Sequence, residues 1–327
     1  MKIFQKYSAI FALLLAFFFA GVPAAQSQQG DGEVHILPVQ GNISMLVGAG
    51  ANITVQAGPQ GVLLVDTGRA ESSAKVLAAL KQITNKPIRY ILDTRYADAH
   101  TGGNDNLRRA GVTITGANVA GNLTDAMQGA AILAHDNVLA RMSAPSGQQS
   151  PTPTGSWPTL TYFGREKELY FNDEAVQMIH VEGNSDGDSI VFFRRSDVVS
   201  TGDIFNTEGY PEIDLAKGGS LQGVIEGLNV ILQLAVPAHE EEGGTLIIPG
   251  RGRLCDEADV VEYRDMVVIV RDRMRAMIKK GMSLEQVKAA KPTYEYDPRY
   301  GAKTGWTTDK FVEAAYKSVA GESRAKK

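Results

Sequence analysis

The stretch DTRYADAHTGGN, residues 93–104, decides how this sequence is interpreted. It follows an apolar run and ends in His-Thr-Gly-Gly-Asn, a turn of the kind that often presents metal ligands. The positions before His100 hold Arg95, Ala97 and Ala99, and an alanine side chain has no donor atom for a metal. The stretch is therefore a metal-binding loop, a former metal-binding loop or an ordinary turn, and the rest of the chain decides among the three.

The N-terminus has the pattern of an export signal. Lys2 and Lys6 precede an apolar run over residues 10–20, and small residues follow it, which predicts a secretory signal peptide over residues 1–27. The run is short for a membrane span, and an uncleaved anchor is the alternative. We expect export to a periplasm or to the outside of the cell, and no membrane span after cleavage.

Composition excludes some partners and some chemistry. Of the 327 residues, 43% are hydrophobic and 21% charged, which is ordinary for a globular protein with a sizeable core. Without the signal segment the chain holds 31 basic and 37 acidic residues, so it lacks the excess of basic residues that is typical of a nucleic-acid-binding protein. Cys255 is the only cysteine, which excludes an internal disulfide; we interpret it as a buried, inert thiol.

Short apolar runs alternate with turns and helical segments. Residues 53–58 and 61–68 predict a hairpin, residues 73–84 a helix, and residues 88–94 a buried strand that leads into the opening stretch. This order is typical of an α/β fold, in which functional groups lie in loops at the ends of strands. Further along we expect a helix over residues 123–142 and a loop anchored by Trp157 over 144–158. Three strands follow over 175–181, 189–194 and 197–203, then a helix capped by Ser220 over 220–231 and a last buried strand over 244–252.

The last seventy residues differ from the rest. Apolar residues spaced three and four apart predict one long amphipathic helix that ends at Gly281; they are Val260, Tyr263, Val267, Val270, Met274 and Met277. Residues 283–290 and 307–319 predict two shorter helices. We expect the apolar faces of this tail to pack on the main domain or on a partner subunit, in which case the chain forms a homo-oligomer.

Five motifs in order resemble the metallo-β-lactamase fold superfamily; they are VLLVDTG (62–68), DTRYADAHTGGN (93–104), EGNSDGDS (182–189), STGDIF (200–205) and IIPGRG (247–252). The resemblance spans roughly residues 34–256, and the tail is similar to an exported, largely uncharacterised branch. It implies an α/β fold (α+β in some schemes), a four-layer αβ/βα sandwich with a metal site at one edge between its sheets. We expect this domain over residues 28–256 and a C-terminal helical extension over 257–327.

The resemblance also implies seven metal-ligand positions, and this chain keeps a ligand at two of them. The retained residues are His100 and Asp203, and the former-ligand positions hold Arg95, Ala97, Ala99, Asn184 and Arg251. A catalytic zinc needs about three protein ligands, and arginine repels a dication. We therefore expect a degenerate zinc site and no cofactor. The alternative is one Zn²⁺ held by His100 and Asp203, with Asp98 as a substitute ligand.

The two arginines allow two interpretations. A buried Asp203 without a metal needs a compensating cation, and Arg95 and Arg251 are placed by the resemblance to supply it. In the other interpretation they leave positive charge open to a small, anionic ligand. Asp66, Gly102 and Gly103 are expected to shape the turns rather than to react.

We therefore expect an exported protein of this fold that acts as a binding or scaffold protein, a pseudoenzyme or degenerate hydrolase. The alternatives are a genuine metal-dependent hydrolase with an unusual mononuclear site, and a structural partner that assembles through its tail. The sequence names no substrate, because this fold hosts many chemistries.

Overall fold

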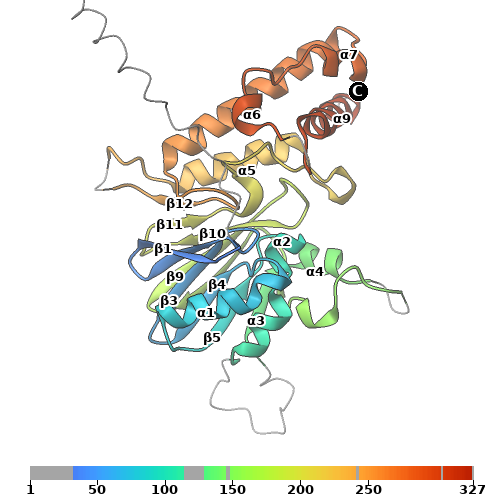
Figure 1. The fold of residues 1–327 in the computed structure, drawn as a ribbon. Coiled ribbons are helices and arrows are strands. Elements are labelled where there is room, and N and C mark those ends of the chain that lie inside the picture. The colour runs from blue at the N-terminus through green and yellow to red at the C-terminus, as the bar shows by residue number, and fades with distance from the viewer. Residues whose placement is uncertain (1–31, 114–128, 145–147, 241–242, 303–304, 326–327) are drawn as a thin grey trace, which may run out of the picture. The chain divides into compact units, whose positions relative to one another are not determined.

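Two β-sheets pack face to face and carry helices on their outer faces in the computed structural model (Figure 1). The structure describes residues 32–113, 129–144, 148–240, 243–302 and 305–325, so the expected signal peptide lies outside the described residues. Residues 33–327 form one compact unit. No helix in the described ranges is long and apolar enough to cross a membrane.

The first sheet has the order β1-β2-β3-β4-β5-β6-β7, antiparallel up to β4 and parallel from β4 to β7. Its strands are β1 (His35–Gln40), β2 (Ile43–Val47), β3 (Ile53–Gly58), β4 (Gly61–Val65), β5 (Ile88–Leu92), β6 (Ala131–His135) and β7 (Leu160–Tyr162). The predicted hairpin is confirmed as β3 and β4, with Gly58 opposite Gly61.

The second sheet has the order β12-β11-β10-β9-β8 and is antiparallel except for the parallel pair β11 and β12. Its strands are β8 (Glu166–Phe171), β9 (Glu174–Val181), β10 (Asp188–Phe193), β11 (Val198–Ser200) and β12 (Leu246–Ile248). Apolar residues from both inner faces, such as Leu63, Leu92, Val191 and Ile248, form one core between the sheets.

Helices cover both outer faces, which gives the four-layer sandwich. They are α1 (Ser73–Ile83), α2 (Asp98–Thr101), α3 (Asn104–Ala110), α4 (Asp136–Met142), α5 (Leu221–Leu234), α6 (Glu257–Lys279), α7 (Leu284–Ala289), α8 (Asp297–Tyr300) and α9 (Thr308–Ala325), with 3₁₀ turns η1 (Ala70–Ser72), η2 (Thr154–Ser156), η3 (Gly202–Ile204) and η4 (Leu215–Lys217). Val76 of α1 and Leu107 of α3 share a core with the first sheet. Leu228 of α5 shares a core with the second.

The tail helices form where the sequence predicts them. The side chain of Asp256 accepts from the backbone of Asp259, and the side chain of Asp259 accepts from that of Asp256, which caps α6 at its start. Tyr263 of α6 and Phe311 of α9 lie in the same core as α5, so the tail packs on the domain of its own chain. Figure 1 shows α6 and α9 beyond α5 on that side of the second sheet.

One predicted helix is wrong in part. Residues 129–142 of the segment expected to be helical over 123–142 are described, and Ala131–His135 is strand β6, with the helix beginning only at Asp136. A short apolar run does not distinguish a buried strand from a buried helix, and here pairing with β5 and β7 decides for the strand. Trp157 anchors its loop as expected, packing beside α4.

Candidate functional site

Polar residues follow the carboxyl ends of strands in both sheets. Asp66 follows β4, Arg95 lies three residues after β5, Asp203 lies three residues after β11, and Arg251 lies three residues after β12. The carboxyl ends of parallel strands meet at one edge of a sheet, and the two packed sheets bring their edges together. These side chains therefore form one cluster, named here the strand-end cluster: Asp66, Arg95, His100, Asp203 and Arg251.

Asp203 is the centre of the strand-end cluster, and only 4% of the residue is exposed. Its Oδ2 accepts from Nη1 of Arg95 at 2.8 Å, and Nε2 of His100 lies 2.9 Å from the same oxygen. Arg251 is farther away, with Nε 3.6 Å from Oδ1. Three cationic side chains thus surround one buried carboxylate.

His100 bridges two carboxylates. Its Nδ1 lies 2.7 Å from Oδ2 of Asp66, and its ring is fully buried. Thr94 also orients Asp66, because its backbone N–H donates to Oδ1 at 2.8 Å and its hydroxyl donates to Oδ2, the oxygen shared with His100, at 2.7 Å. Asp66 has a φ of 63°, in the left-handed region that aspartate tolerates better than most residues.

The charges in this cluster support one another. Burial alone would lower the pKa of His100, but Asp203 and Asp66 outweigh it and raise that pKa to about 9. Burial alone would raise the pKa of Asp203, but His100, Arg95 and Arg251 hold it well below its usual range. At neutral pH His100 is therefore an imidazolium, held between Asp203 and Asp66.

Three of the former-ligand positions contribute little beyond backbone and amide contacts. The carbonyl of Ala97 accepts from the N–H of His100 at 2.8 Å, and the carbonyl of Ala99 accepts from Ala51 at 3.0 Å. The side-chain amide of Asn184 is buried and donates to the carbonyl of Glu212 at 2.8 Å.

Asp98 does not reach the strand-end cluster. Its side chain is 71% exposed and lies 3.6 Å from Nη1 of Arg69. Asp98 and His100 are two residues apart on α2, and residues at that spacing point to different sides of a helix. In this structure Asp98 therefore lies beside Arg69 and outside the strand-end cluster, which differs from the position expected of a substitute ligand.

Gly102 and Gly103 let the turn lie close to the segment that follows β4. A Cβ on Gly102 would come within 2.9 Å of the backbone nitrogen of Ala70, and one on Gly103 within 2.6 Å of the carbonyl of Thr67. The N–H of Gly103 also donates to the carbonyl of Gly68 at 2.9 Å. This close approach fixes where His100 stands relative to Asp66.

The sequence interpretation did not assign Asp93 and Asn104, the first and last residues of the opening stretch. Asp93 is fully buried, and burial together with the nearby charge of Asp66 raises its pKa well above the usual range. Asn104 donates to Oδ2 of Asp93 at 2.9 Å and accepts from the hydroxyl of Thr67 at 2.8 Å. A polar residue directly after a buried apolar strand was the signal that could have identified Asp93.

Residues 46–241 match the family model of the metallo-beta-lactamase superfamily, which is more than half of the chain. The chain belongs to the metallo-β-lactamase superfamily. No curated protein matches it. Among solved structures it is similar to a metallo-beta-lactamase from Pontibacter korlensis, with a TM-score of 0.53 and 11% identity over 72% of this chain and 99% of that one.

Two further solved structures share this fold. The DIM-1 metallo-beta-lactamase has a TM-score of 0.51 and 13% identity over 72% of this chain and 97% of that one. The inverting sec-alkylsulfatase Pisa1 from Pseudomonas sp. has a TM-score of 0.58 and 15% identity over 87% of this chain, which spans half the length of that enzyme. At these identities the likeness establishes the fold alone.

Zinc, the metal that the superfamily usually binds, does not fit the donors that this chain presents. Among the described residues no group of three or more His, Cys, Asp and Glu is placed to hold a metal ion. Both ring nitrogens of His100 already face carboxylates, with Nε2 2.9 Å from Asp203 and Nδ1 2.7 Å from Asp66, so neither points to an open metal position. Arg95 already supplies the positive charge beside Asp203.

Proposed function

We propose that this chain is an exported metallo-β-lactamase-fold protein that works without zinc, as a binding or scaffold protein rather than as a metallohydrolase. The observation that carries the proposal is the oxygen of Asp203 shared by Arg95 and His100, at 2.8 and 2.9 Å. A buried carboxylate is stable only when its charge is compensated, and here two protein cations compensate it. Export and self-association through the tail stay predictions from the sequence.

The cluster carries more positive than negative charge. Two carboxylates face three cationic groups: Asp66 and Asp203 against Arg95, His100 and Arg251. The excess charge suits a small anion.

Arg251 is the member of the cluster that such an anion can reach. Its side chain is 26% exposed, against 5% for Arg95 and 0% for His100. Its contact with Asp203 is also the longest in the cluster, so a ligand can compete for it. Carboxylate and phosphate groups match the planar donors of arginine, and we propose this chemical class for the ligand.

Metal content and thermal stability of the mature protein test the proposal. The protein is purified without a histidine tag and dialysed against zinc, and metal per chain is measured by mass spectrometry. We expect well below one ion per chain, no change of the melting temperature with a chelator, and a rise of the melting temperature with phosphate or citrate. Arg251→Ala should reduce that rise, whereas the exposed control Arg109→Ala should leave it unchanged.

The contrary result is equally clear. One firmly bound ion per chain, with a melting temperature that falls when a chelator removes it, would overturn the metal-free interpretation. Stabilisation by phosphate that is the same in the Arg251→Ala variant would instead reject Arg251 as the anion-binding residue.

A further inference from the structure

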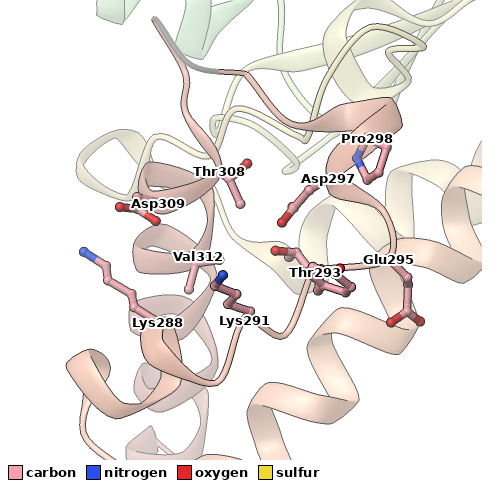
Figure 2. A pocket seen from close by; sticks show the side chains of 10 residues that line it. Lys288, Lys291, Thr293, Glu295, Asp297, Pro298, Thr308, Asp309 and Val312 are labelled. Atoms are coloured by element: carbon pink, nitrogen blue, oxygen red, sulfur yellow. The ribbon is translucent and has the colours of Figure 1, made fainter.

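A cavity in the C-terminal tail has no role in the strand-end cluster. It lies between α7, the segment that follows it, and the start of α9, as Figure 2 shows. Its volume is about 590 Å³, within the range of small-molecule sites. Its lining includes Lys291, Thr293, Tyr294, Asp297, Thr308 and Val312.

Some of the charges at this cavity are already neutralised. Nζ of Lys288 lies 3.0 Å from Oε2 of Glu313, and Arg273 lies 2.6 Å from Oε1 of Glu295. In Figure 2 the side chains of Lys288 and Glu295 also point away from the centre of the cavity. They belong to its rim.

Lys291 and Asp297 are different, because neither forms an ion pair within the described part of the chain. Figure 2 shows the ammonium of Lys291 and the carboxylate of Asp297 pointing into the cavity from separate segments. The hydroxyl of Tyr210 donates to Oδ1 of Asp297 at 2.8 Å, which orients that carboxylate without adding a charge. The cavity thus presents opposite charges that do not pair with each other.

The backbone of Lys291 gives a second, independent observation. It follows the last turn of α7 and has a φ of 47°, in the left-handed region that helix ends usually fill with glycine or asparagine. A lysine is sterically unfavourable there, and ending the helix does not require one. An unfavourable residue at such a position points to a role for its side chain.

We propose that this cavity binds a small zwitterion with an apolar side chain, such as a free α-amino acid. Lys291 binds the carboxylate of the ligand, and Asp297 binds its ammonium group. The buried Val312 contacts the apolar side chain, and the hydroxyls of Thr293 and Thr308 are available for hydrogen bonds. The site is separate from the strand-end cluster and does not depend on the function proposed for it.

Three matched probes test the class of ligand by calorimetry on the mature full chain. They are L-leucine, 4-methylpentanoate (which lacks the amine) and 3-methylbutylamine (which lacks the carboxylate). We expect leucine to bind about tenfold or more tightly than either, since each lost charge removes one charge-assisted contact. No binding of leucine, or equal binding of 4-methylpentanoate, overturns the proposal.

Substitutions separate binding from folding. Lys291→Gly should weaken leucine binding about tenfold or more while raising the melting temperature, because glycine relieves the left-handed backbone. The control Asp173→Gly, at another exposed residue with a φ of 60°, should raise the melting temperature and leave binding unchanged. Asp297→Asn should make leucine and 4-methylpentanoate bind alike. Full leucine affinity in the Lys291→Gly variant would refute the assignment.

Discussion

Replacing Arg95 by methionine removes the charge that compensates Asp203 while keeping a side chain of similar length. The ion pair is short, at 2.8 Å, and its side chains are only 5% and 4% exposed. Removing one partner of a buried pair costs about 3–5 kcal/mol when the other charge is left uncompensated. His100 still lies 2.9 Å from Asp203, so we expect the lower end, about 3 kcal/mol.

Arg251→Met provides the internal comparison. Its Nε is 3.6 Å from Asp203 and its side chain is 26% exposed, so we expect a loss of about 1 kcal/mol or less. Urea unfolding, followed by the fluorescence of Trp157 and Trp306, measures both losses. In a thermal scan they correspond to roughly 6–12 °C for Arg95→Met and 2–4 °C for Arg251→Met.

The surface variant Arg109→Met sets the background, because Arg109 forms an exposed ion pair with Asp105. A cost for Arg95→Met no greater than this background would refute the idea that protein cations replace the metal charge. Equal costs for Arg95→Met and Arg251→Met would refute the ranking that the two distances imply.

Three further predictions concern single side chains. His100 has a folded pKa of about 9 against an ordinary 6.5, so its contribution to the free energy of unfolding is complete below pH 6.5 and is lost as pH rises through 9. Urea unfolding should show the free energy of unfolding fall by about 3 kcal/mol over that window, and the His100→Gln variant should not show this fall. Burial raises the pKa of Cys255 to about 12, so Ellman's reagent at pH 8 should react at least roughly 100-fold more slowly with the native chain than with the unfolded one, and equal rates would contradict its burial. Asp66→Asn keeps a residue that tolerates the left-handed backbone but disturbs the contacts with Thr94 and His100, so it should cost about 2 kcal/mol in urea unfolding, whereas Asp173→Asn should cost nearly nothing.

The fold was predictable because its signals are local and repeat in order. The hairpin of β3 and β4, the cap of α5 by Ser220 and the apolar stripe of α6 each depend on neighbours in the sequence. Strand β6 was missed because AILAH is equally compatible with a buried helix, and only its partners β5 and β7 distinguish the two.

The candidate site was predictable in its members but not in its contacts. The motifs identify His100, Asp203 and the two arginines, since each follows a recognisable strand end. They do not reveal that Asp98 points to solvent, because one step along a short helix turns a side chain by about 100°. Nor do they rank Arg95 above Arg251, a difference set by how closely two distant segments approach Asp203.

The sequence by itself determined the order of the motifs along the chain, the amphipathic tail and the residue types at the five positions where the resemblance expects metal ligands, because residue identity and spacing are properties of the chain alone. Only the tertiary structure decided that Asp203 is shared by Arg95 and His100, that Asp98 is excluded from them, and that Lys291 and Asp297 face one cavity. These relations depend on distances and burial between distant segments, which are set by the packing of the sheets and the tail and leave no local pattern in the sequence.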